Sequence, residues 1–221
     1  MNRRTWMKSL PALAALAPRA RAAEQLAPIA LPKPQTEGGK PLMQAIMQRR
    51  TTREIAPDKL PLQTVSNLLW AAFGVNRTEG PMGRPGRTAP SAMNLQEIEI
   101  YVALPEGVYR YEAVPHRLAP VMAEDIRPKV GRRPAVGQAP MSLIYVTDMS
   151  KFAKVQQPEM QIGFTNADVG FIAQNVYLYC ASEGLASWFH TPDREALGKL
   201  LGLSGQQRVL YAHTVGYPAK K

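Results

Sequence analysis

Two short runs of this chain combine side chains that could hold an anionic or polar ligand. The first, the arginine run, joins three guanidinium groups to two hydroxyls within Arg49, Arg50, Thr51, Thr52 and Arg53. A guanidinium presents paired donors in one plane, and a neighbouring hydroxyl completes a cradle for phosphate. A solvated basic helix end, favoured by the helix dipole, would use the same residue types. The run alone therefore leaves both a phosphate site and a charged helix end open.

The second run, the polar loop of residues 90–96, places hydroxyl and amide groups just before a strand-like segment. Its polar side chains are Ser91, Asn94 and Gln96. Such groups suit the rim of a planar heterocycle, where hydrogen-bond donors and acceptors alternate. An ordinary turn held by an Asx-type hydrogen bond is the alternative.

Together the two runs resemble motifs of the FMN-dependent nitroreductase family. That family has an early Arg-Arg-Ser/Thr-x-Arg element and a later Pro-Ser-x-x-Asn-x-Gln element, similar to residues 49–53 and 90–96 here. Residues 184–188 resemble its Gly-Leu-Gly-Ser/Thr-x-Trp turn, and residues 214–218 resemble its closing strand with Gly-Tyr-Pro. The likeness covers residues 42–221. It is closest to the branch related to thiazole and oxazole peptide dehydrogenases.

The resemblance implies a role for each run. Arg49 and Thr51 would hold the FMN phosphate, and Arg53 would face the N1–C2 edge of the ring, where a cation stabilises reduced flavin. Asn94 would bond the pyrimidine edge, and residues 184–186 would present backbone amides near N5. The cofactor-binding candidates are Arg49, Arg50, Thr51, Arg53, Pro90, Ser91, Ala92, Asn94, Gln96, Gly184, Leu185, Ala186 and Lys220. No residue stands out as a catalytic acid or base, which hydride transfer through a flavin does not require.

The resemblance also bears on assembly. Members of the family are homodimers with the flavin at the subunit interface, so one chain would hold only part of a site. They often carry further basic residues after Gly-Tyr-Pro. Here Lys220 and Lys221 are the residues left to complete the phosphate site.

Hydrophobic periodicity predicts an α+β fold, with helices packed on a mostly antiparallel central sheet. Helical spacing covers residues 42–50 and 61–73, a long stretch from about Thr165 to the natural stop at Gly184, and a helix opened by Thr191-Pro192 and ended by Gly202. Strand patterns cover residues 98–102, 107–111, 116–121, 143–146 and 208–215. Residues 77–89 contain too much glycine and proline for regular structure. The basic cluster of Arg127, Lys129, Arg132 and Arg133 is expected to be a solvated loop, with contact to an anionic substrate or a membrane surface as the alternative.

The amino terminus has the pattern of an export signal. Arg3 and Arg4 precede a short apolar segment, residues 10–17, which resembles signals read by the twin-arginine translocase. That segment is far below the ~20 residues that span a bilayer. Small residues at positions 20 and 22 suit cleavage before Ala23. We expect a signal over residues 1–22, an extended leader over 23–40, a flavin domain over 41–221, and a periplasmic location.

Composition argues against several other classes of function. The chain has 27 basic and 17 acidic residues, but five basic residues precede residue 23, and the remaining excess is too diffuse for nucleic acid. Cys180 is the one cysteine, which excludes an internal disulfide and suits a buried core position. His116, His190 and His213 have no metal-site spacing. No later apolar run is long enough to span a membrane.

These patterns predict an exported FMN-dependent oxidoreductase that transfers hydride or two electrons between a donor and a small organic substrate. The donor could be NAD(P)H, a quinol or a redox protein, because the periplasm has no regular pool of nicotinamide. A flavin carrier or electron-transfer protein without turnover is the alternative. A basic module that binds an anionic polymer or lipid is a third hypothesis.

Overall fold

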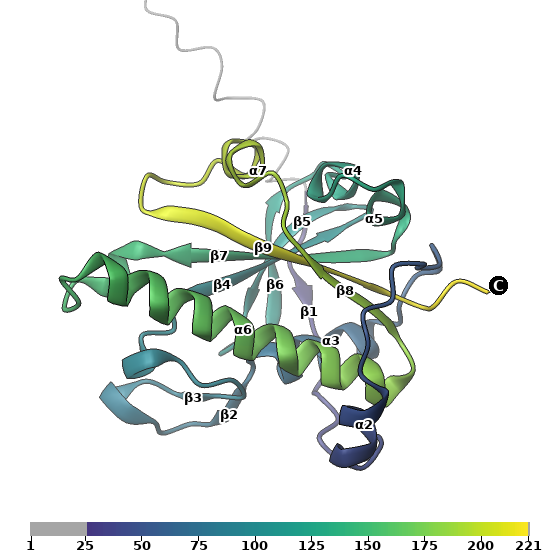
Figure 1. The fold of residues 1–221 in the computed structure, drawn as a ribbon, viewed down its shortest axis with the longest axis horizontal. Coiled ribbons are helices and arrows are strands. Elements are labelled where there is room, and N and C mark those ends of the chain that lie inside the picture. The colour runs from purple at the N-terminus through teal and green to yellow at the C-terminus, as the bar shows by residue number, and fades with distance from the viewer. Residues whose placement is uncertain (1–25, 221) are drawn as a thin grey trace, which may run out of the picture.

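The computed structural model describes residues 26–220, so the predicted export signal and its cleavage point lie outside the described part. Seven strands form one sheet in the order β1–β6–β5–β4–β7–β9–β8, and each neighbouring pair is antiparallel (Figure 1). The strands are β1 (Ile29–Ala30), β4 (Ile98–Leu104), β5 (Gly107–Glu112), β6 (Arg117–Met122), β7 (Met141–Asp148), β8 (Ala186–His190) and β9 (Gln207–Gly216). The predicted α+β fold with a mostly antiparallel sheet is confirmed.

Helices cover both faces of this sheet. They are α2 (Leu42–Gln48), α3 (Leu62–Phe73), α4 (Arg127–Val130), α5 (Pro134–Gln138), α6 (Pro158–Glu183) and α7 (Arg194–Leu201). A small ribbon of β2 (Val75–Arg77) and β3 (Gly86–Arg87) lies apart from the main sheet (Figure 1). Within the described residues, no helix combines the length and apolar character that crossing a membrane requires.

The sheet has a core on each face, and strand β7 contributes to both. Leu143 and Tyr145 belong to the core that contains α3 and α6, whereas Ile144 and Val146 belong to the core that contains α4, α5 and α7. All four side chains are fully buried. A continuous apolar run is what a strand covered on both faces requires. The predicted interior position of this strand is therefore confirmed.

Helix α6 begins earlier than predicted, at Pro158 rather than near Thr165. Its first turns leave Met160 and Ile162 exposed, so they carry no one-sided apolar pattern. The start signal is the proline itself, whose missing amide is tolerated at the first helical position. The predicted end is confirmed, because Gly184 follows with a φ of +71°, a left-handed conformation that glycine adopts at little cost.

Three further segments differ from the sequence predictions. Asp193 caps α7 by accepting a hydrogen bond from the first turn, so the cap is not Thr191. The stretch rich in glycine and proline is irregular over most of its length, as predicted, but Arg77 and Gly86–Arg87 within it belong to the β2–β3 ribbon. Part of the predicted solvated loop forms α4, where Arg127 donates to Asp125 at 2.7 Å. Local hydrogen bonds decide the structure of all three segments, and hydrophobic periodicity carries no information about such bonds.

Candidate functional site

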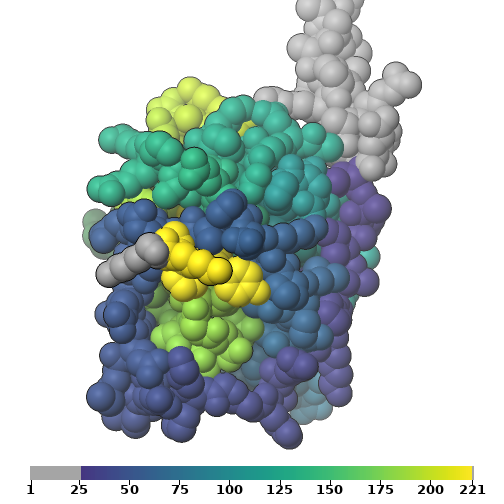
Figure 2. Space-filling model, turned by 90° about the vertical axis from the view of Figure 1, so that its right-hand side faces the viewer, coloured from purple at the N-terminus to yellow at the C-terminus, as the bar shows by residue number. Residues whose placement is uncertain are grey.

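The arginine run leaves α2 as an extended chain along the free edge of β8. The Thr52 amide donates to the Ser187 carbonyl at 2.9 Å. On its other side, the Ala219 amide donates to the Glu54 carbonyl at 3.0 Å, which places Lys220 beside the same segment. The run therefore lies between β8 and the C-terminal tail, shown in yellow across this face in Figure 2.

Tyr177 of α6 organises the first half of the run. Its hydroxyl lies 2.9 Å from the Thr51 hydroxyl and accepts the Phe189 amide at 3.0 Å. Because the hydroxyl already accepts from that amide, its own proton is free to bond Thr51. The Arg49 guanidinium lies over the same ring, 5.4 Å from its centre. Arg49 and Thr51 are thus held together at one aromatic residue.

Trp188 of β8 organises the second half. The guanidinium groups of Arg53 and Arg133 each lie 5.7 Å from the centre of its ring. Arg133 belongs to the basic cluster that was expected to be a solvated loop, because that cluster carries no pattern that separates a site residue from a solvated one. Within residues 26–220, neither these two arginines nor Arg49 pairs with a carboxylate. Three cations are therefore available to an anionic group.

Arg50 donates from its Nε to the Gln48 carbonyl at 3.3 Å. It lines a cavity of about 420 Å³ together with Tyr177, and with Gly184 and Leu185 at the end of α6. Ala186 begins β8 and is buried. The turn of residues 184–186 thus adjoins the arginine run, as the candidate site requires.

The polar loop is held by its own side chains. Asn94 donates to the Pro81 carbonyl at 2.7 Å and accepts from the Gln96 amide group at 2.8 Å. Gln96 also accepts from Arg87 at 2.7 Å. Met93, Asn94 and Gln96 have φ between +52° and +53°, which non-glycine residues rarely adopt. Strain of this kind collects where a backbone must present its groups to a ligand.

The arginine run and the polar loop do not meet within one chain. The run contacts α6 at Tyr177, whereas the loop contacts it at Asp168, through the Ala92 amide at 2.9 Å. Nine residues of α-helix separate these points by about 13 Å. One chain thus gathers Arg49, Thr51, Arg53, residues 184–186 and Lys220, and leaves residues 90–96 elsewhere.

Two buried carboxyl groups, which the sequence analysis missed, lie against the polar loop. Glu97 and Asp168 are both buried, and they accept hydrogen bonds from the neighbouring loop residues Ser91 and Ala92. Burial and the neighbouring Asp168 raise the pKa of Glu97 to about 7. Burial also raises the pKa of Asp168. An acid beside a strand and an acid within a helix give no joint signal in sequence, because 71 positions separate them.

The histidines and the cysteine serve the core. His213 bonds Ser187 at 2.6 Å and Tyr145 at 3.2 Å, and burial lowers its pKa to about 3. Burial lowers the pKa of His190 to about 4. Cys180 is buried, as predicted, and burial raises its pKa to about 12. Within the described residues, no group of three or more potential ligands could hold a metal ion.

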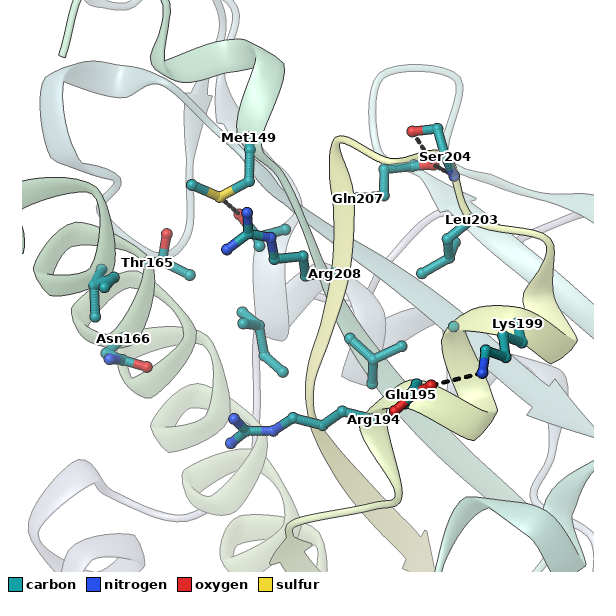
Figure 3. Close-up of a pocket in the computed structure, with 15 residues that line it drawn as sticks. Met149, Thr165, Asn166, Arg194, Glu195, Lys199, Leu203, Ser204, Gln207 and Arg208 are labelled. Atoms are coloured by element: carbon teal, nitrogen blue, oxygen red, sulfur yellow. Dashed lines mark hydrogen bonds and ion pairs between the residues drawn. The ribbon is translucent and has the colours of Figure 1, made fainter. Parts of the chain in front are cut away.

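A further cavity of about 570 Å³, the α6–α7 cavity, lies away from the candidate site (Figure 3). Helix α6 contributes Ile162 and Thr165 to its wall, and the α7 side contributes Arg194 and Leu203. The Thr165 hydroxyl is buried and has no hydrogen-bond partner in the part of the chain that the structure describes. None of the cofactor-binding candidates lines this cavity.

Comparison with known proteins agrees with this geometry. A solved structure from Ralstonia eutropha JMP134, named provisionally as a nitroreductase, is 39% identical, covers 88% of this chain and 90% of its own, and has a TM-score of 0.81. A protein of Methanocaldococcus jannaschii with a similar provisional name is 29% identical over 156 residues, 66% of this chain and 76% of its own.

A more distant likeness concerns the fold alone. The NADPH:FMN oxidoreductase from Vibrio harveyi, solved with NAD+, is 18% identical, covers 81% of this chain and 69% of its own, and has a TM-score of 0.59.

The model of the nitroreductase family matches residues 46–217, nearly all of the folded part. With this match and the fold in agreement, the chain belongs to the nitroreductase family.

Proposed function

We propose that this chain is an FMN-dependent oxidoreductase. The observation that supports it most is the set of Arg49, Arg53 and Arg133 around Tyr177 and Trp188, free of carboxylate partners in the described residues. Guanidinium donors suit a phosphate, and the backbone amides at the end of α6 suit ring heteroatoms. This donor set fits FMN, which when bound supplies a centre for hydride or two-electron transfer.

Each group has a distinct task in this proposal. Arg49, Thr51 and Lys220 would bind the phosphate. Arg53, with Arg133 beside it, would place a fixed cation at the pyrimidine edge of the ring. A preorganised cation there stabilises the negative charge that reduction brings. No protein acid or base is required at this stage, because positioning accounts for most of the protein's contribution.

We further propose a homodimer with the flavin at its interface, because one chain separates the two halves of the site. Helix α6 exposes a stripe of small residues, Gly163, Ala167 and Gly170, continued by Phe171 and Gln174. Antiparallel pairing of two such helices about a twofold axis between Phe171 and Gln174 is self-complementary. It would bring the polar loop of one copy to the arginine run of the other.

Helix α2 supports the same arrangement. Its apolar side chains Leu42, Met43, Ile46 and Met47 are between 46% and 84% exposed. Such a dense apolar patch on a short surface helix marks an interaction site. The helix packs near the C-terminal end of α6 (Figure 1), so antiparallel pairing would carry it toward the second copy's α6–α7 cavity. Both apolar surfaces would then be buried.

The proposal also covers the substrate, the electron donor and the location of the protein. We propose a small organic substrate and a donor among NAD(P)H, a quinol and a redox protein. Export by the twin-arginine route follows from Arg3 and Arg4 and would deliver the protein already folded around its cofactor. Placement in the branch related to thiazole and oxazole peptide dehydrogenases rests on the motif likeness of the polar loop.

Steady-state turnover tests the enzymatic part of the proposal. Purified protein with FMN is supplied with NADH, NADPH or a reduced quinone, and the reduction of quinone and nitroaromatic acceptors is followed. An enzyme gives sustained product formation in proportion to its concentration with at least one donor. Reduction of the flavin once, without sustained product from any pair, would instead establish a carrier without turnover.

A further inference from the structure

The Glu97–Asp168 carboxyl pair has no part in the function proposed above, although it touches the polar loop directly. Asp168 accepts the Ala92 amide at 2.9 Å, and Glu97 accepts the Ser91 hydroxyl at 3.3 Å. The Ser91 hydroxyl in turn accepts the Gln96 amide at 2.8 Å. The pair therefore holds both ends of the turn whose residues have positive φ.

Two buried carboxyl groups that bind the adjacent residues Ser91 and Ala92 repel each other if both are ionised. An ionised carboxylate offers only acceptors, so a direct hydrogen bond between the two would need a proton on one of them. The second oxygen of Glu97 is buried and lacks any partner in the described residues, which would be costly for a full charge. The geometry thus indicates one proton and one negative charge for the pair.

The charged groups around the pair do not neutralise it. Lys151 donates to the Gln96 carbonyl at 2.7 Å, and Arg84 donates to the Leu95 carbonyl at 2.7 Å. Arg87 is engaged with Gln96. Glu99, Asp148 and Glu97 all favour the charged form of Lys151, whose pKa burial nevertheless lowers overall. Among residues 26–220, no ion pair includes Glu97 or Asp168.

We propose that Glu97 and Asp168 share one proton and act as positioning residues, holding the polar loop in the strained shape in which it contacts the flavin. This inference rests on the proposed function, because it assigns the pair a purpose in cofactor binding. Loss of the shared proton places two like charges in contact and releases the Ala92 amide or the Ser91 hydroxyl. The loop then relaxes from its left-handed backbone conformation, and flavin binding weakens.

The sign of the pH dependence follows from the raised pKa. The pKa of Glu97 is about 7 in the folded protein, against 4.5 ordinarily. The pair therefore keeps its proton at pH values below this pKa and loses it at pH values above it. FMN affinity should therefore fall as pH rises above about 7, by at most about tenfold per pH unit, the limit for one proton. The FMN phosphate itself titrates near pH 6, but it does so equally in every variant. Comparing the variants therefore isolates the contribution of the Glu97–Asp168 pair to the pH dependence.

Amide variants provide the decisive test. Asp168→Asn keeps an acceptor for the Ala92 amide and gives a permanent donor to Glu97. Glu97→Gln keeps an acceptor for the Ser91 hydroxyl and gives a permanent donor to Asp168. Both variants should bind FMN like the wild type at acidic pH. Above about pH 7, where wild-type affinity is expected to fall, their affinity should stay constant. Asp168→Ala should bind weakly at every pH, and Glu99→Gln, a carboxyl two residues along, should keep the wild-type profile.

Flavin-free protein provides an independent readout. Infrared difference spectra between wild type and Glu97→Gln should show a protonated carboxyl band at neutral pH that disappears above it. Absence of that band, or a fall in FMN affinity that is unchanged in both amide variants, would overturn the inference. Failure of wild-type protein to bind FMN at any pH would overturn the proposed function instead, even with the band present.

Discussion

At the scale of single residues, Tyr177 and Trp188 convert a flexible basic segment into an ordered one. Arg49 and Thr51 are fixed on the first ring, and Arg53 with Arg133 on the second. Long basic side chains lose rotamer freedom when they bind, so ordering them in advance reduces the entropic cost of holding a ligand. The aromatic residues therefore preorganise the cations.

Arg49 is the first residue to test. Arg49→Ala should weaken FMN binding by about 2–4 kcal/mol, because it removes a charge-assisted contact to phosphate in a partly enclosed site. Titration of flavin-free protein with FMN measures the loss. Arg117→Ala is the matched control, since Arg117 lies on β6 and forms a surface pair with Glu112 at 2.6 Å. Equal affinities for the two variants would refute the phosphate role.

Arg133 has a neighbour that serves as its control. Arg133→Ala removes a cation from the Trp188 ring and should weaken FMN binding by about 0.5–2 kcal/mol. Arg132→Ala removes an exposed charge one position away and should leave binding unchanged. The same titration, repeated in higher salt, compares them. If both variants lose affinity equally, general positive charge rather than a placed cation is responsible.

At the scale of elements, prediction from sequence succeeded where a local rule decides the structure. The ends of α6 and α7 follow from glycines in left-handed conformations, and the apolar run in β7 follows from burial on both faces. Prediction failed where contacts between distant segments decide the structure. The first turns of α6 are exposed, and β8 is a strand only because β9 pairs with it.

The same division applies to the candidate site. The arginine run and the glycine turn are continuous motifs, so sequence could indicate them. Arg133, Glu97 and Asp168 acquire their roles from contacts between distant segments, such as the bond from the Ala92 amide to α6. Single-chain geometry also shows that the two motifs lie apart, which the order of motifs along a sequence does not reveal.

A pair of glycine variants tests the account of the helix ends. Gly184→Ala should destabilise the protein by about 1–2 kcal/mol, because alanine disfavours left-handed backbone. Gly198→Ala, in the interior of α7, should stabilise it by about 0.5–1 kcal/mol. At both positions an added methyl meets no atom within 4 Å, so packing does not contribute. Chemical denaturation gives the two values, and effects of the same sign would contradict the account.

At the scale of the whole molecule, the exposed stripe of α6, the apolar face of α2 and the α6–α7 cavity all lie on the surface that antiparallel pairing would bury. A chain of this length can bury a complete core by itself. In the proposed dimer, association would be required by the flavin site rather than by folding. Loss of the dimer should therefore remove FMN binding and leave the fold of each subunit intact.

Ala167→Glu tests this dependence. It adds a charge to the stripe that pairing would bury, and burying an unpaired charge opposes association. Light scattering should show half the wild-type mass, circular dichroism should be unchanged, and FMN binding should be lost. Ala123→Glu makes the same chemical change at an exposed position after β6 and should leave all three unchanged. Full FMN binding by a monomer would disprove the shared site.

The most direct test of the central claim is the visible absorbance spectrum of the purified protein, with the released cofactor identified and counted. The account predicts the paired bands of oxidised flavin and release of FMN, with about one FMN for each chain and two for each dimer. A colourless protein that also fails to take up added FMN would contradict it, and would leave the arginine run as a surface for another anion.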